Sequence, residues 1–331
     1  MLQLLLGGSG SGKTTLLYQR IRARAEKGKK SILLVPEQFT SSTEGRIYRE
    51  LGDALSGMVE SFSFTSLAEK ILSTEGGAAV QTLSDAGRAV LVRRALEELQ
   101  DNVHYYHRHR RSAAFCQMAA QTIDELKSAG LSGQQLAQLA GACGAESGKL
   151  SELALIFQGY ETLLARSGMD PSDRLELAGA RLEEALARHS LPEFLRDRAV
   201  FIDEFDTFNA PKKRLLGAML AALPSVTVAL CDDGAPLLPG DLSLFSGAKQ
   251  VAAQLRQLAR KNGAEVAVPQ LLRKDLRHRN APGLAAVAEL LETGSCTADA
   301  PADEVRLFAA PSREEEARAA AGAIRRLMRQ G

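Results

Sequence analysis

Hydrophobic residues follow two different patterns in the first eighty residues of the chain. Residues 2–6, 31–35 and 58–62 are short, largely apolar runs. The first run is followed by residues 14–27, where Leu16, Leu17 and Ile21 lie on one face of a predicted helix. Pro36 ends the second run, and a further predicted helix, residues 66–72, follows the third. A near-continuous apolar run is typical of a strand covered on both faces. We therefore expect strand–helix units that build a parallel sheet with right-handed crossovers.

The pattern changes at about residue 84 and stays changed until about residue 189. Ala, Leu, Glu, Gln and Arg dominate, and apolar residues recur at helical spacing, as in Leu153, Ile156 and Tyr160. This texture predicts an all-helical insertion. Strand-like runs return at residues 199–202 and 225–230.

Further along, residues 299–303 are typical of a linker. We expect a last strand at residues 305–309 and a charged helix at residues 313–329.

A glycine-rich segment follows the first predicted strand and opens the first predicted helix. Residues 7–14 fit G-x-x-x-x-G-K-[ST], the P-loop pattern. In such a loop the backbone amides face the β-phosphate, the Lys13 ammonium bridges the β- and γ-phosphates, and the Thr14 hydroxyl binds Mg²⁺. A Gly/Ser-rich turn without a ligand is the alternative. The segment predicts an ATP site with contacts from Gly7, Gly10, Ser11, Gly12, Lys13, Thr14 and Thr15.

Two carboxylates end the apolar run at residues 199–202. A P-loop needs a second strand that carries a carboxylate for the metal ion. We expect Asp203 to hold Mg²⁺ through water, and Glu204 to act as the catalytic group that orients or deprotonates the attacking water. The alternative is an acidic turn at the end of a strand.

Charge and cysteine content narrow the class of protein. Lys and Arg total 41 against 40 for Asp and Glu, a formal net charge of +1, so any DNA contact must come from local patches. The four cysteines lie far apart without metal-ligand spacing, as expected for thiols in a reducing cytosol. The apolar run at residues 4–6 is too short for a signal peptide or a membrane span. We expect a cytoplasmic protein without a membrane partner.

Five stretches of the chain, taken in order, resemble the N-terminal part of AddB, the B subunit of the bacterial ATP-dependent helicase/deoxyribonuclease AddAB. The resemblance spans essentially all 331 residues, and the Pro-Glu-Gln, Ser-Phe-Ser-Phe and Glu-Leu-Lys-Ser-Ala-Gly segments are its more specific parts. The five stretches are residues 4–14, 34–38, 59–68, 123–130 and 201–208.

The resemblance implies an architecture related to superfamily 1 helicases. The fold would be α/β, with a P-loop, RecA-like parallel sheet and an all-helical insertion domain. The first motor domain would be residues 1–83 and 196–298, the insertion 84–195, and the linker with the start of a second motor domain 299–331. The chain would then be the N-terminal fragment of a longer protein.

The resemblance also implies partners and a role. An AddB-like protein would form a heterodimer with an AddA-like helicase–nuclease subunit. It would act on single-stranded DNA and duplex ends, in double-strand break processing for recombinational repair. A nuclease domain with an iron–sulfur cluster is expected only in a C-terminal region outside this chain. Positions matching helicase segments that touch single-stranded DNA suggest contacts by Phe39, Thr40, Ser63 and Phe64, whose alternative role is packing under the sheet edge.

The chain also departs from the helicase pattern. Residues 231–234 read Cys-Asp-Asp-Gly where an active helicase would offer Gly-Asp and then a phosphate-sensing Gln. The adenine-reading glutamine segment is missing, and the arginines that reach the γ-phosphate belong to a second motor domain. We therefore expect binding of ATP–Mg²⁺ with slow or absent hydrolysis. Three alternatives stay open: an active superfamily 1 helicase that has been truncated, a structural DNA-binding scaffold with a vestigial ATP site, and a small-molecule P-loop kinase.

Overall fold

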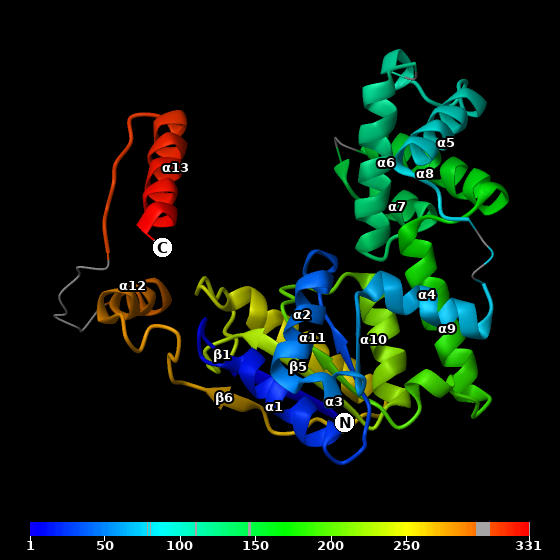
Figure 1. The fold of residues 1–331 in the computed structure, drawn as a ribbon. Coiled ribbons are helices and arrows are strands. Elements are labelled where there is room, and N and C mark those ends of the chain that lie inside the picture. Colours follow the sequence, from blue (N-terminus) through cyan, green and yellow to red (C-terminus); the bar gives the residue numbers. More distant parts are fainter. Residues whose placement is uncertain (78, 80, 110, 145–146, 296–304, 331) are drawn as a thin grey trace. The chain divides into compact units, whose positions relative to one another are not determined.

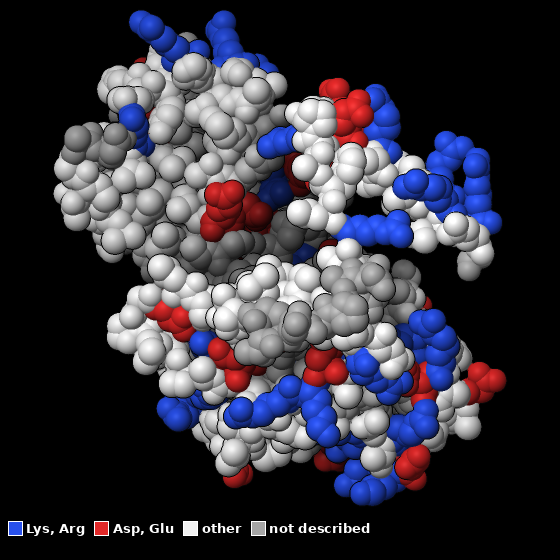
Figure 2. Space-filling model, turned by 90° about the vertical axis from the view of Figure 1, so that its left-hand side faces the viewer, with Lys and Arg blue, Asp and Glu red and all other residues white. Residues whose placement is uncertain are grey.

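The computed structural model describes residues 1–77, 79, 81–109, 111–144, 147–295 and 305–330. The chain forms two compact units, Met1–Arg273 and Lys274–Gly331. The first unit holds a parallel sheet and a helical body, and the second holds two helices, α12 (Pro282–Thr293) and α13 (Arg313–Gln330). Basic and acidic side chains lie interspersed in the lower part of the face shown in Figure 2.

Every strand pairing in the described sheet is parallel, and the strand order is β3-β2-β4-β5-β1-β6. Strand β5 therefore lies between β1 and β4, and the sheet is the α/β, RecA-like arrangement that the sequence predicts (Figure 1). The strands are β1 (Leu2–Gly7), β2 (Ser31–Leu34), β3 (Val59–Phe62), β4 (Ala199–Ile202), β5 (Ser225–Cys231) and β6 (Gln270–Leu272).

The central strands are largely buried because helices cover both faces of the sheet. In β1, Leu4 and Leu6 join one hydrophobic core, while Leu5 points to the other face. Helices α4, α9, α10 and α11 cover the first face, and α1 and α2 cover the second. The bounds are α1 (Lys13–Ala25), α2 (Thr40–Leu51), α4 (Phe64–Glu75), α9 (Pro171–Ala187), α10 (Ala210–Ala222) and α11 (Ser246–Lys261).

The helices between α4 and α9 pack around a hydrophobic core of their own. They are α5 (Asp85–Glu98), α6 (Ala113–Ser128), α7 (Gly133–Ala140) and α8 (Ser147–Ser167). Phe157 and Tyr160 of α8 are almost completely buried at its centre. Helix α9 is different, because its Leu175, Ala178 and Leu182 belong to the core of the sheet. The predicted division into domains stays a prediction, with α9 as a helix that packs on the sheet.

An ion-pair cluster joins the end of α6 to the start of α9. The Lys127 ammonium lies 2.6 Å from an Asp170 carboxylate oxygen and 2.5 Å from one of Asp173. Asp170 caps α9, since its other oxygen accepts from the Asp173 amide at 2.9 Å. The pair ties the helical body to the helix that packs on the sheet. Lys127 lies within the Glu-Leu-Lys-Ser-Ala-Gly segment.

Two short segments differ from the sequence-based expectation. Strand β6 pairs with β1 at the edge of the sheet, although its three residues carry little strand signal. The predicted strand at residues 305–309 is wrong, because these residues adopt no regular structure. Leu307 is fully exposed and Phe308 is 65% exposed, and a strand forms only against a neighbouring strand. The predicted helix that follows is confirmed as α13, and the predicted linker at residues 299–303 lies outside the described residues.

Truncating Phe157 should destabilise the helical body. The side chain is completely buried among α5, α6 and α8, so Phe157→Ala should lower the free energy of unfolding by about 3–5 kcal/mol. Phe308→Ala is the matched control, because the same truncation at an exposed position should change stability by less than about 0.5 kcal/mol. Denaturant titration followed by circular dichroism measures both. Equal effects of the two substitutions would contradict the assignment of this core.

Candidate active site

The P-loop connects β1 to α1 through a backbone that only glycine adopts easily. Gly10 and Gly12 have φ angles of 78° and 88°, in the left-handed region. Gly7 serves close packing, since a Cβ there would lie 2.4 Å from Ser11 Oγ and 2.6 Å from the Leu272 carbonyl oxygen. The loop therefore turns sharply at the end of β1 and delivers the chain into α1.

The start of α1 is open to an anion. No side chain among the described residues caps the helix at Gly12, and its first turn contains no acidic residue. Free amides at a helix N-terminus attract anions such as phosphate. Ser11 is buried, and its hydroxyl finds no hydrogen-bond partner in the described part of the chain. The loop thus offers unsatisfied donors, with Thr14 half-buried and Thr15 exposed beside it.

The Lys13 ammonium folds back over the loop. It donates to the carbonyl oxygens of Gly7 and Gly8, both at 2.8 Å, and lies 3.9 Å from Cys231 Sγ. The positive charge is therefore held at the mouth of the loop, where a phosphate chain would lie. Cys231 is the last residue of β5 and pairs with Gly7 in the sheet.

The carboxylate predicted to serve the metal lies beside the P-loop. Asp203 directly follows β4, is 6% exposed, and accepts a hydrogen bond from the Glu204 amide at 3.0 Å. Burial raises the pKa of the Asp203 carboxyl above its ordinary value, and the Thr14 hydroxyl, the Glu204 amide and the Lys13 charge oppose this rise. Thr14 and Asp203, distant in sequence, line the same small cavity.

Glu204 stands next to this pair in a strained backbone conformation. Its φ angle is 65°, which is uncommon for a residue with a side chain, and the side chain is exposed. Together with Thr14 and Asp203 it lines a cavity of about 190 Å³. Desolvation and the neighbouring Asp203 charge raise the pKa of Glu204 above its ordinary value, and the Arg46 charge opposes this rise.

Two further residues of this cavity were not predicted from the sequence. Tyr18 of α1 is buried, and burial raises the pKa of its hydroxyl to about 12. The guanidinium carbon of Arg46, from α2, lies 5.0 Å from the centre of the Tyr18 ring. The positive charge of Arg46 opposes the rise in the pKa values of Asp203 and Glu204. The sequence carries no motif for Arg46, because only the packing of α2 beside α1 brings it here.

A divalent cation fits this donor set only together with a ligand. The part of the chain that the structure describes holds no group of three or more His, Cys, Asp and Glu side chains suited to a metal. Mg²⁺ is commonly bound by one or two carboxylates together with substrate phosphates and water. Thr14 and Asp203 supply protein oxygens of this kind at one point, so the residues fit Mg²⁺ in complex with a nucleotide.

The two segments predicted to touch DNA meet beside this site. A second cavity, of about 390 Å³, is lined by residues 35–38, 63–65, 204–207 and Lys212. Val35 and Glu204 line both cavities. Phe39 is 38% exposed and lines the smaller cavity, while the Thr40 hydroxyl donates to the Glu37 carbonyl at 2.9 Å.

Ser63 and Phe64 have clear packing roles in the structure. Ser63 is buried and caps α4, because its hydroxyl accepts from the Ser66 amide while the Ser66 hydroxyl accepts from the Ser63 amide. Phe64 is 3% exposed and packs edge-on against Phe205 and Phe208. Their contact with DNA stays a prediction, and Thr65 is the exposed side chain beside them in the larger cavity.

The turn after β5 is closed by its own hydrogen bonds. Asp232 is buried and accepts from the Gly234 amide at 2.7 Å, and Asp233 accepts from the Ala235 amide at 2.8 Å. The Lys249 ammonium of α11 lies 3.3 Å from Asp233. Two carboxylates therefore follow Cys231 in the turn where the helicase pattern would have a phosphate-sensing group.

Residues 4–288 match the family described as ADDB, N-terminal. Three similar proteins are ATP-dependent helicase/deoxyribonuclease subunits B. That of Desulforudis audaxviator is 34% identical over 342 residues, that of Moorella thermoacetica 33% over 345, and that of Symbiobacterium thermophilum 32% over 353. Each comparison covers 99% of this chain and 29% of the relative, so the chain spans less than a third of their length. No helix in the described residues is long and apolar enough to cross a membrane.

Replacing Asp203 by Asn should raise stability without ligand. Because burial raises the folded pKa of Asp203, the folded state loses stability as the pH rises from the ordinary value near 3.8 through the folded pKa. The ionised carboxylate therefore destabilises the fold at neutral pH. Asp203→Asn should raise the Tm at pH 7, and this gain should shrink as the pH falls toward 3.8.

Differential scanning fluorimetry across pH measures this effect. Asp206→Asn is the control, because Asp206 is exposed three residues further along. A lower Tm for Asp203→Asn than for the unchanged chain at pH 7 would contradict the argument.

Proposed function

This chain belongs to the AddB N-terminal family, and we propose that it binds ATP–Mg²⁺ within a subunit that processes DNA double-strand breaks for recombinational repair. The single observation that carries the nucleotide part is that Thr14 and the buried Asp203 line one cavity beside an uncapped P-loop helix. Two segments far apart in sequence thus converge on the place where a P-loop needs a metal ligand.

Each residue of the site has a role in the proposal. The phosphates would be held by hydrogen-bond donors of the loop, namely the amides of Gly10, Gly12 and Thr15 and the donors of Ser11. The Lys13 ammonium would leave the carbonyls of Gly7 and Gly8 to bind the β- and γ-phosphates. Thr14 and Asp203 would hold Mg²⁺, which neutralises phosphate charge when bound. Glu204 would orient or deprotonate the attacking water.

The arrangement of the two cavities supports a DNA role that is coupled to the nucleotide. The backbone of residues 203–205 passes from the nucleotide cavity to the larger one, where Glu204 and Phe205 face the predicted DNA segments. Lys212 lies there over the rings of Phe64 and Phe205 at 5.8 and 5.6 Å. The relatives are named as subunits of a helicase/deoxyribonuclease. We propose single-stranded DNA and duplex ends as ligands and an AddA-like subunit as the partner, in the cytoplasm.

The closed turn after β5 supports slow hydrolysis. Asp232 and Asp233 are held by local amides and by Lys249, so the turn presents carboxylates rather than a donor to a γ-phosphate. This favours nucleotide binding over rapid turnover by residues 1–331. It also distinguishes the proposal from an active superfamily 1 helicase and from a P-loop kinase, both of which need rapid chemistry. The iron–sulfur cluster belongs, in this proposal, to a region outside this chain.

Lys13→Ala should weaken nucleotide binding. A charge-assisted hydrogen bond is worth about 1.5–3 kcal/mol, so the dissociation constant for ATP–Mg²⁺ should rise by about 10- to 100-fold. The fold should persist, because the hydrogen-bond partners of the ammonium among the described residues are the carbonyls of Gly7 and Gly8 in the loop and the sulfur of Cys231. Isothermal titration calorimetry measures affinity, and Lys261→Ala at an exposed position is the matched control. Unchanged affinity would remove the P-loop assignment and favour the vestigial scaffold.

ATP turnover by residues 1–331 should be slow even with DNA present. A missing cation at the γ-phosphate reduces turnover by about 10³-fold or more. A coupled phosphate-release assay, run with and without single-stranded DNA, measures this at a nucleotide concentration that saturates binding. Brisk, DNA-stimulated turnover would contradict the proposal and favour an active helicase motor.

A further inference from the structure

The largest of the three cavities described here lies at the opposite edge of the sheet from the P-loop. It has a volume of about 880 Å³. Much of its lining comes from the segments that enter strands: residues 28–30 before β2, residues 193, 194 and 196–198 before β4, and Pro224 before β5. Because all strands are parallel, these segments lie at the amino edge. The cavity is therefore separate from both cavities at the carboxyl edge.

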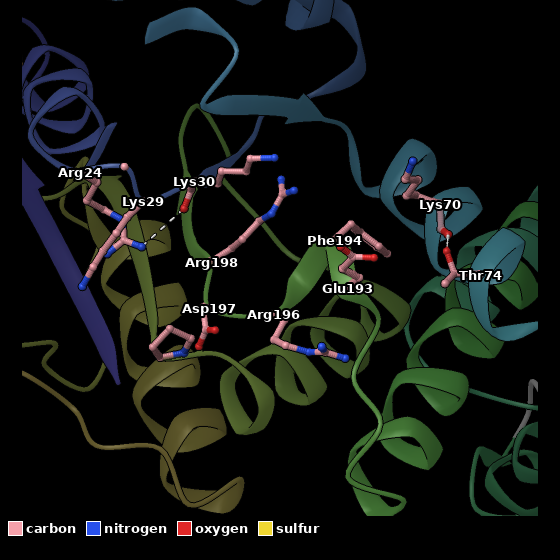
Figure 3. Close-up of a pocket in the computed structure, with 12 residues that line it drawn as sticks. Arg24, Lys29, Lys30, Lys70, Thr74, Glu193, Phe194, Arg196, Asp197 and Arg198 are labelled. Atoms are coloured by element: carbon pink, nitrogen blue, oxygen red, sulfur yellow. Dashed lines mark hydrogen bonds between the residues drawn. The ribbon is translucent and has the colours of Figure 1, made fainter. Parts of the chain in front are cut away.

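Basic residues dominate this lining. Glu193 and Asp197 are the acidic residues among those that line the cavity, against six basic ones: Arg24, Lys29, Lys30, Lys70, Arg196 and Arg198. Figure 3 shows these side chains around the cavity, with Arg24 at the end of α1 on one side and Lys70 and Thr74 of α4 on the other. Since the whole chain has a net charge of only +1, this is a local concentration of positive charge.

Most of these cations have no acidic partner within the described residues. Arg198 pairs with Glu60 of β3. Arg24 donates instead to the Ser31 hydroxyl and the Lys30 carbonyl, and Arg196 donates to the Leu191 carbonyl. Within the described chain, Lys29, Lys30 and Lys70 likewise form no ion pair. Like charges gathered around one cavity repel each other, and an anionic ligand relieves that repulsion.

An aromatic ring lies among the cations. Phe194, half-buried in the short 3-10 helix η4 (Glu193–Leu195), lines the cavity, and the Lys70 ammonium lies 5.8 Å from its ring centre. Cations that follow a phosphate backbone, with an aromatic side chain on which a base can stack, are the combination that binds single-stranded nucleic acid. An acidic peptide would use the charges but would have no use for the ring.

We propose that this amino-edge cavity binds the phosphodiester backbone of a single DNA strand, with Lys29, Lys30 and Arg196 on the phosphates and Phe194 against a base. The proposal rests on the DNA-related part of the proposed function and not on the nucleotide site. It adds a DNA contact remote from Phe39, Thr40, Ser63 and Phe64.

A triple substitution at the cavity tests the proposal. Lys29→Ala, Lys30→Ala and Arg196→Ala are combined, and binding of a fluorescent oligothymidylate of about 20 nucleotides is measured by anisotropy over a salt series. The affinity at low salt should fall by about tenfold or more. The slope of log affinity against log salt should decrease in magnitude by about 2, because each neutralised phosphate of a single strand contributes about 0.7.

The matched control removes the same charge elsewhere. Arg93→Ala, Arg94→Ala and Arg166→Ala together delete three exposed arginines of the helical body, two of which form surface ion pairs of little energetic weight. This control should leave the affinity within about twofold. Equal losses in the two triple variants would overturn the proposal, since they would show a diffuse charge effect.

A second variant distinguishes binding of a DNA strand from binding of free phosphate. Phe194→Leu keeps the packing but removes the ring, so it should weaken oligothymidylate binding while leaving the binding of inorganic polyphosphate unchanged. Loss of polyphosphate binding alone in the triple variant would overturn the proposal in favour of a free-phosphate site. Competition by polyglutamate as strong as by the oligonucleotide would overturn it in favour of an acidic peptide.

The affinity of the cavity variant for ATP–Mg²⁺ keeps the two proposals distinguishable. The triple variant should bind ATP–Mg²⁺ normally, because its substitutions lie at the other edge of the sheet. If the triple variant binds both ATP–Mg²⁺ and DNA as the unchanged chain does, the proposed DNA site in the cavity is refuted and the proposed nucleotide site is not. DNA binding lost in the triple variant but retained in Lys13→Ala supports the cavity even if nucleotide binding fails.

Discussion

The convergence of Thr14 and the buried Asp203 carboxylate on one cavity is the constraint on which the candidate site depends. Sheet register brings the two groups together. Strand β5 pairs with β1 so that Gly7 faces Cys231, and with β4 so that Ile202 faces Val228. The chain therefore leaves β1 and β4 at the same edge, one strand apart. A slip of one residue in either pairing would turn Asp203 to the opposite face of the sheet.

The helical body shows how a long insertion can lie between two strands without disturbing this register. Its core around Phe157 is separate from the core of the sheet. Its exit is fixed by Lys127, which holds the buried N-cap Asp170 of α9, and α9 then packs on α4 and α10. The Glu-Leu-Lys-Ser-Ala-Gly segment thus has a structural explanation, because its lysine secures the return of the chain to the sheet.

The parts of the fold that the sequence predicts are those whose signal is local. Local sequence is enough to predict the strands β1, β2 and β4 from their apolar runs, and the P-loop from its glycines. The α/β class follows from these elements. Other features depend on distant neighbours. Strand β6 exists because β1 offers it a free edge, whereas residues 305–309 have similar apolar content and adopt no regular structure. Arg46 reaches Asp203 only through helix packing, and the basic cavity gathers side chains from four separate segments.

Strand β4 relates the two edges of the sheet to each other. Arg198 precedes it, at the basic cavity, and Asp203 follows it, at the P-loop, so about four residues at ~3.3 Å each separate the two sites. All four residues of β4 are buried, and its pairing with β2 and β5 fixes its register. A strand held in this way keeps the distance between the two edges constant, and it cannot slide along its neighbours when a ligand binds at one edge. The carboxyl edge offers the direct route for coupling between nucleotide and DNA, because Glu204 and Val35 line both cavities there and the backbone at Glu204 is strained. Anions bound at the amino edge would then add affinity without changing the nucleotide site.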